Sequence, residues 1–121
     1  MCSVEQLMNR RIPTEIINIV KKYKSITIKI DNMEEKFDII ESREILKHYL
    51  EQRELFDYDY LPFAVLDDDY LCLDFNKEKV KIVYWSSERV LEDKNLGIWI
   101  IYNSVQQFLD NILIANYRKI S

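Results

Sequence analysis

The chain of 121 residues contains a single glycine, Gly97, and this restricts how its backbone can turn. Glycine lacks a Cβ atom and adopts left-handed backbone angles readily, as many tight turns and phosphate-binding loops require. The sequence therefore excludes Gly-rich dinucleotide fingerprints and phosphate-cradling loops. Aspartate and asparagine tolerate left-handed angles better than other residues, so we expect them to replace glycine in turns. They stand at breaks in the apolar pattern, at residues 31–32, 67–69, 76–77 and 95–97.

Charge and the scarcity of histidine exclude further classes of protein. A net charge of −4 and a pI near 5.1 disfavour nucleic acid as a direct partner, because binding phosphates needs a basic surface. One histidine excludes the two-histidine zinc helix. Cys2 and Cys72 form no CxxC motif, and Cys72 lies in an apolar run typical of a buried thiol. The sequence predicts no metal, no cofactor and no enzymatic activity.

The length fits one domain over residues 1–121, and no Pro-, Gly- or Ser-rich linker divides the chain. Its first residues, MCSVEQLMNRR, lack the apolar core of a signal peptide. The longest strongly apolar run, Ile98–Tyr102, is much shorter than the roughly 20 residues that span a bilayer. We therefore predict a cytoplasmic protein with no membrane partner.

Hydrophobic spacing predicts two helices and a hairpin in the first half of the chain. Residues 14–24 follow Pro13 with helical spacing and with lysines near the end, which favours a helix. Residues 26–30 alternate as a strand does, and residues 36–41 are the predicted antiparallel partner. Ser42 is the predicted cap of a second helix. The apolar stripe of that helix consists of Ile45, Leu46, Tyr49, Leu50 and Phe56.

Strand patterns dominate the second half. Short apolar runs at residues 62–66, 70–75, 80–86 and 98–102 alternate with turn residues. After Asn103 or Ser104, helical spacing predicts a closing amphipathic helix. We expect its apolar stripe to lie in the core; the stripe consists of Val105, Phe108, Leu109, Ile112 and Leu113. These elements predict an α+β fold with a mostly antiparallel (mixed) sheet of about five to six strands covered by three helices.

Acidic and aromatic residues concentrate between residues 54 and 76. This segment has seven acidic residues and neither lysine nor arginine, although the whole chain has 17 basic and 21 acidic side chains. Its tyrosines combine an apolar ring with a polar hydroxyl, a chemistry enriched at protein interfaces. An acidic patch would increase the rate at which a basic partner associates. The predicted partner-binding residues are Asp57, Tyr58, Asp59, Tyr60, Asp67, Asp68, Asp69, Tyr70 and Trp85.

Each of these residues also has a purely structural interpretation. Residues 67–69 are then a turn without glycine, and the other acidic residues are a solvated rim. Tyr84 and Trp85 are neighbours in a predicted strand, so one faces the core and the other faces away; core packing competes with a partner contact for Trp85. A catalytic or metal-binding role for the acidic residues has the least support, because no EF-hand spacing is present. His48 lies beside the apolar stripe, as a solvated helix histidine does.

Three consecutive motifs resemble a known family. Leu61-Pro62-Phe63-Ala64 precedes the acidic turn, and Tyr70-Leu71-Cys72-Leu73-Asp74-Phe75 and Val83-Tyr84-Trp85 follow it. This order resembles the LPFA, YLCLD and V-Y-Y-W strands of the SUKH superfamily, in its Smi/Knr-type branch. Residues 103–109 and 12–13 agree more loosely with the closing segment and the start of the first helix. Similar sequences usually carry glycine where this chain has residues 67–69.

The resemblance implies a SUKH-like α+β domain that acts by binding and not by catalysis. In bacteria such proteins are typically immunity proteins, which neutralise a cognate polymorphic or contact-dependent toxin, and fungal relatives regulate cell-wall synthesis. The acidic segment leads us to expect a basic toxin, such as a nuclease domain. The alternative is a regulatory or scaffolding module of the same fold that binds an endogenous partner. The oligomeric state stays open at this point.

Overall fold

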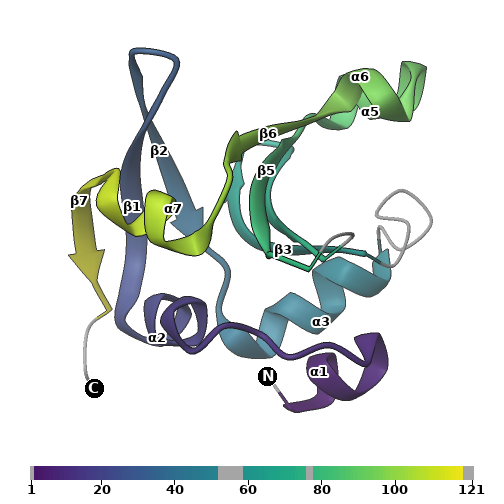
Figure 1. Cartoon of the computed structure of the whole chain (residues 1–121). Helices are drawn as coiled ribbons and strands as arrows, with labels where there is room; N and C mark the ends of the chain where they lie inside the picture. Colours follow the sequence, from purple (N-terminus) through teal and green to yellow (C-terminus); the bar gives the residue numbers. More distant parts are fainter. Residues whose placement is uncertain (1, 52–58, 76–77, 119–121) are drawn as a thin grey trace.

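A curled antiparallel sheet of seven strands is the centre of the fold (Figure 1). The computed structural model describes residues 2–51, 59–75 and 78–118. The strands are β1 (Tyr23–Ile30), β2 (Met33–Ile39), β3 (Tyr60–Leu66), β4 (Asp69–Asp74), β5 (Lys81–Trp85), β6 (Ile98–Tyr102) and β7 (Ile112–Tyr117). The helices are α1 (Cys2–Met8), α2 (Thr14–Lys22), α3 (Ser42–Glu51), α5 (Ser87–Glu92), α6 (Lys94–Gly97) and α7 (Val105–Asp110). The predicted α+β class is confirmed, with more strands and more helices than expected.

The strand order β6-β5-β4-β3-β2-β1-β7 follows the chain from β1 to β6 and returns β7 to the far side of β1. The sheet is curled (Figure 1), and side chains on strands distant in this order make contact. The Phe37 ring on β2 contacts the Tyr84 ring on β5, with 6.1 Å between the centroids. The hydroxyl of Tyr102 on β6 donates a hydrogen bond to the Lys29 carbonyl on β1. The curl therefore brings one edge of the sheet close to the β1–β2 hairpin.

Aspartate and asparagine make the turns at residues 31–32 and at Asp67, as the sequence predicts, whereas the predicted break at residues 95–97 lies in helix α6. Asp31 and Asn32, which join β1 to β2, have φ angles of 47° and 67°, and Asp67 between β3 and β4 has a φ of 54°. Gly97 has no positive φ angle and lies in α6 instead of a loop. A Cβ atom at this glycine would lie only 2.2 Å from Cγ2 of Val90. Gly97 therefore allows α6 and α5 to pack closely together, and no turn depends on it. The predicted turn at residues 76–77 lies outside the described residues.

The predicted elements of the first half are present with shifted ends. The first predicted helix ends at Lys22 because the chain enters β1 at Tyr23, and β2 covers residues 33–39. The second predicted helix begins at Ser42, but its first hydrogen bonds reach the carbonyl of Glu41, to which the N–H of Ile45 donates over 3.2 Å. Glu41 therefore takes the capping position and Ser42 is the first residue of the helix, so the predicted cap was wrong by one residue. Leu50 is 46% exposed, so its predicted place in the apolar stripe was wrong; Phe56 lies outside the described residues.

The predicted closing helix is only half correct. Ser104 caps α7 as expected, because its Oγ accepts a hydrogen bond from the N–H of Gln107 over 3.0 Å. The helix ends after Asp110, where the side chain of Asn111 donates to the carbonyl of Gln107 over 2.8 Å. Residues 112–117 form strand β7, because the free edge of β1 offers them backbone partners. Leu113 was therefore wrongly predicted in the core, and it is 47% exposed.

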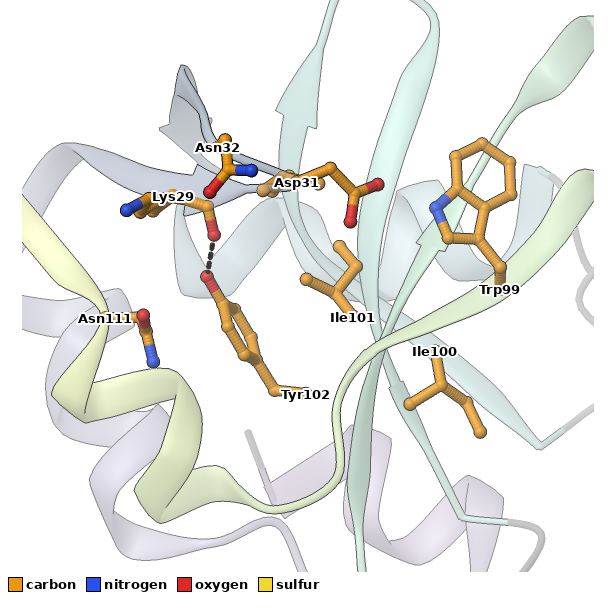
Figure 2. A pocket seen from close by; sticks show the side chains of 9 residues that line it. Lys29, Asp31, Asn32, Trp99, Ile100, Ile101, Tyr102 and Asn111 are labelled. Carbon is orange, nitrogen blue, oxygen red and sulfur yellow. Dashed lines mark hydrogen bonds between the residues drawn. The ribbon is translucent and has the colours of Figure 1, made fainter.

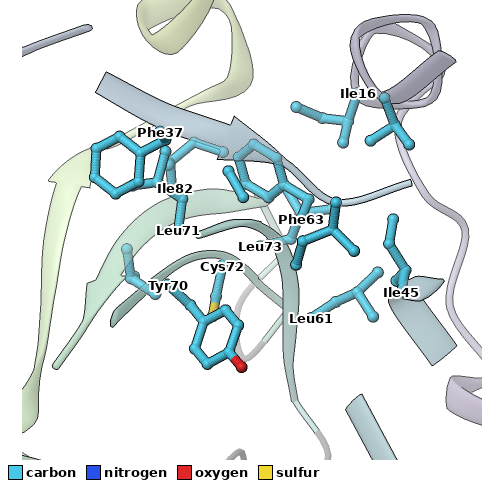
Figure 3. Packing of buried hydrophobic residues seen from close by; sticks show 14 of the residues in the cluster. Ile16, Phe37, Ile45, Leu61, Phe63, Tyr70, Leu71, Cys72, Leu73 and Ile82 are labelled. Atoms are coloured by element: carbon cyan, nitrogen blue, oxygen red, sulfur yellow. The ribbon is translucent and has the colours of Figure 1, made fainter. Parts of the chain in front are cut away.

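The core lies between the curled sheet and the helices α1, α2, α3 and α7. Figure 3 shows part of this packing, in which strand side chains meet Ile16 of α2 and Ile45 of α3. Phe108 of α7 is fully buried and its ring meets Phe63 of β3, with 5.6 Å between the centroids. Cys72 is fully buried, as predicted, and burial raises the pKa of its thiol well above the ordinary value.

Candidate functional site

The predicted partner-binding residues fall into two groups at opposite ends of β3. Asp59 and Tyr60 lie at the start of this strand, and Asp67 and Asp68 follow its end. An extended strand of this length separates its two ends by about 20 Å. The acidic segment of the sequence therefore does not form one continuous patch. Asp57 and Tyr58 lie outside the described residues.

The group at the end of β3 surrounds a groove of about 450 Å³, which we call the acidic groove. Its walls come from α3, from the β3–β4 hairpin, from β5 and from α5. The residues that line it are His48, Val65, Asp67, Asp68, Tyr70, Trp85, Ser87 and Leu91. Four of the predicted partner-binding residues are thus brought to one cavity, two acidic and two aromatic.

The base of the acidic groove is aromatic. The rings of Tyr70 on β4 and Trp85 on β5 are neighbours in register, with 5.6 Å between their centroids. Tyr70 is 8% exposed and Trp85 is 1% exposed, so core packing is the structural role of Trp85. The ring of His48 packs edge-on against Tyr70, and its Nδ1 lies 3.1 Å from the Tyr70 hydroxyl. The expected solvated histidine is therefore half-buried, because α3 lies over this face of the sheet (Figure 1).

Burial also determines the protonation state of Tyr70, which lies at the bottom of the acidic groove. Desolvation raises the pKa of Tyr70, and electrostatic interactions with the nearby acidic groups Cys72, Glu51 and Asp68 add to that effect. Tyr70 therefore remains a neutral phenol at physiological pH. It presents a hydroxyl, not a charge, toward His48.

The rims of the acidic groove are exposed. Asp67 and Asp68 form the tip of the β3–β4 hairpin, and both side chains face solvent. Leu91 of α5 lies on the other rim and is 74% exposed. An exposed acidic edge thus stands opposite an exposed aliphatic one, over a base of buried rings. Such an arrangement suits a protein partner that has a basic and an apolar element.

Asp69, the third residue of the acidic run, is committed to the fold. Its Oδ2 accepts a hydrogen bond from the Tyr84 hydroxyl over 2.5 Å. Its Oδ1 accepts from the backbone N–H of Ser87 over 3.0 Å and from the Ser87 hydroxyl over 3.4 Å. Burial, followed by the hydrogen bond and the charge of Asp69, raises the pKa of Tyr84. Asp69 therefore ties the hairpin to the first turn of α5.

The group at the start of β3 has different surroundings. The Asp59 carboxylate lies 3.7 Å from Nη2 of Arg10, and both side chains are partly exposed. The Asp59 carbonyl also accepts a hydrogen bond from the N–H of Phe75 over 3.0 Å. Neither Asp59 nor Tyr60 lines the acidic groove. A role for these two residues in partner binding stays a prediction.

Sequence reasoning missed the wall that α5 supplies. Ser87 and Leu91 belong to this helix, which the apolar pattern did not indicate because only Val90 of the helix is buried. The available signal was the pair Ser86–Ser87 followed by Glu88, since serine is favoured before a first helical turn and an acid within it.

The fold is an α+β domain in which the acidic groove is walled by α3, the β3–β4 hairpin, β5 and α5. Among the described residues, no group of three or more His, Cys, Asp or Glu side chains is placed to hold a metal ion. Within the same part of the chain, no helix is long and apolar enough to cross a membrane.

The chain belongs to the SMI1 / KNR4 family (SUKH-1), whose family model matches residues 3–111. The resemblance seen in the sequence is therefore confirmed. No curated protein and no solved structure matches the chain.

Proposed function

We propose that this chain is a bacterial immunity protein that binds and neutralises a cognate protein toxin through the acidic groove. It acts in the cytoplasm, without catalysis and without a metal or cofactor. The observation that carries the proposal is the placement of exposed Asp67 and Asp68 beside the aromatic base formed by Tyr70 and Trp85. Membership of the SUKH-1 family supports it, because bacterial proteins with this resemblance are typically immunity proteins.

The chemistry of the groove favours a basic toxin, such as a nuclease domain. A nuclease cleft is basic because it binds phosphates, and an acidic hairpin tip complements that charge. Asp67 and Asp68 steer the encounter, and the apolar rim at Leu91 adds contact area. The inserted hairpin then blocks the cleft by occupancy. Asp69 contributes indirectly, because it fixes the two rims relative to each other.

The first test is whether the chain neutralises the product of a neighbouring gene. We expect expression of that product alone to arrest growth and co-expression of this chain to restore it. A neighbouring product that is harmless by itself, but that still binds this chain, would favour the regulatory or scaffolding alternative instead.

The second test measures association kinetics of the purified pair at low and high salt. Reversing both charges with Asp67→Lys and Asp68→Lys should lower the association rate about tenfold or more at low salt. High salt should slow the wild-type protein toward the variant, because exposed charges are screened over about 8–10 Å. The matched control is Asp31→Lys with Glu34→Lys, the same charge change at the exposed β1–β2 hairpin. An unchanged association rate in the first variant would remove the acidic turn from the interface.

A further inference from the structure

The sheet has two edge strands, β6 and β7, and they differ in what surrounds them. An edge strand leaves backbone N–H and C=O groups without a partner in the sheet, so it can pair with another strand. The β1–β2 hairpin faces β6 across a groove of about 470 Å³ (Figure 2). Trp99 and Ile100 on β6 line that groove with Asp31 and Asn32 of the hairpin. The hairpin therefore restricts the approach of another sheet to β6.

The β7 edge lies on the opposite side of the sheet, beyond β1 (Figure 1). Its sequence, ILIANY, has no charged residue, no proline and no glycine. Natural edge strands are usually protected from pairing by lysine, by proline or by a covering segment. Three side chains of β7 are also strongly exposed: Leu113 at 47%, Ile114 at 59% and Tyr117 at 71%.

The β7 strand is held in a fixed position. Asn116 donates through Nδ2 to Oγ of Ser25 over 2.8 Å. Directly after the strand, Arg118 donates through Nε to the carbonyl of Val20 over 3.0 Å and through Nη2 to the carbonyl of Ile39 over 3.2 Å. A strand that is already ordered loses little conformational freedom when it pairs.

Charge at the two ends of β7 points to the partner. Exposed Asp110 precedes the strand, and exposed Lys22 and Lys24 lie beside its end, where β1 begins at Tyr23 opposite Tyr117. Two copies related by a two-fold axis pair antiparallel, so the start of each strand lies beside the end of the other. This brings Asp110 of each copy toward the lysines of its partner. The uncharged strands themselves meet without repulsion.

We propose that two copies of this chain pair through β7 and form one continuous antiparallel sheet. Leu113 of each copy then lies near Leu113 of the other copy on one face of the joined sheet, and Ile114 lies near its counterpart on the opposite face. The acidic groove lies on β3, β4 and β5, with β1 and β2 between it and the interface. The dimer therefore leaves both grooves open, and this inference does not depend on the proposed toxin.

The experiment is sedimentation velocity of the purified chain over a concentration series. Wild type should form a dimer, and Ile114→Lys should raise the dimer dissociation constant about tenfold or more, because a buried lysine opposes pairing. The matched control is Ile100→Lys on the other edge, at a residue that is 47% exposed; it should dimerise like wild type. A wild-type monomer at every concentration, or a dimer lost only in the Ile100→Lys variant, would overturn the proposal.

A charge exchange tests whether the two β7 strands pair antiparallel. This test does not require that the Ile114→Lys variant folds. Asp110→Lys and Lys24→Asp should each weaken the dimer, whereas the double variant should restore it toward wild type, because both ends keep opposite charges. High salt should reduce all of these differences. Two single variants whose effects simply add in the double variant would contradict antiparallel pairing.

Discussion

The two rims of the acidic groove, the β3–β4 hairpin tip and α5, differ in sequence and in how they are held. On one rim, Asp67 and Asp68 face solvent at a hairpin tip. The other rim, α5, is attached to the sheet by the carboxylate of Asp69, the next residue of the same acidic run. Three consecutive aspartates thus divide into two that are available to a partner and one that shapes the site. A count of charges along the sequence cannot separate these roles.

The way in which α5 is attached, which makes it the fixed rim of the groove, also explains where the chain uses its single glycine. The carbonyl of Gly97 accepts a hydrogen bond from the N–H of Ser86 over 2.8 Å, and the carbonyl of Ser86 accepts from the N–H of Val90 over 3.0 Å. These bonds hold α5 and the start of β6 so close that Gly97 touches the backbone of Val90. The other rim, the tip of the β3–β4 hairpin, which we call the exposed rim, turns without glycine because Asp67 itself adopts the left-handed conformation.

The largest expected effect is on the fixed rim. In Gly97→Ala the added Cβ would lie 2.4 Å from the backbone nitrogen of Val90, so α5 must move. We expect a loss of about 3 kcal/mol in the free energy of unfolding, measured by denaturant titration. Gly97 has no positive φ angle, so the loss would come from contact and not from backbone strain. A variant within 0.5 kcal/mol of wild type, roughly the range of ordinary surface changes, would show that α5 is not held this closely.

Asp69→Asn should have the next largest effect. The amide oxygen can still accept from the Tyr84 hydroxyl, but the amide nitrogen cannot accept from the N–H and hydroxyl of Ser87. We expect a loss of about 1–3 kcal/mol in the free energy of unfolding. The matched control, Asp68→Asn, removes the same charge from an exposed side chain and should stay within about 0.5 kcal/mol of wild type. Equal losses in both variants would contradict the division of roles within the acidic run.

The sequence predicts the elements well where the local pattern and the tertiary contacts agree. The strands β3 to β6 alternate with turns of aspartate or asparagine or with polar stretches, so the apolar runs locate them. The prediction is wrong for residues 112–117, because their apolar spacing continues the helical pattern of α7. Only the free edge of β1, formed more than 80 residues earlier in the chain, makes them a strand. No short window of sequence contains that edge.

The residues of the candidate site, too, could be predicted only where the local sequence pattern agrees with the tertiary contacts. The sequence selects Asp67, Asp68, Tyr70 and Trp85, which the fold gathers around one groove. The sequence also groups Asp59 with these residues, because Asp59 belongs to the same acidic segment. In the fold, however, the extended strand β3 separates Asp59 from them. His48 and Leu91 reach the groove from two separate helices, so no local motif could have included them.

The smallest expected effect concerns the turn at the exposed rim, and it separates the shape of that rim from its charge. Asp67 has a φ of 54°, which glycine adopts freely and alanine adopts at a cost of about 1 kcal/mol. Asp67→Gly should therefore keep the free energy of unfolding within about 0.5 kcal/mol of wild type, and Asp67→Ala should lose about 1 kcal/mol. Both variants remove the same carboxylate, so both should slow association with a basic partner equally. If Asp67→Ala binds much more slowly than Asp67→Gly, the backbone shape of the turn governs recognition, and the charge does not.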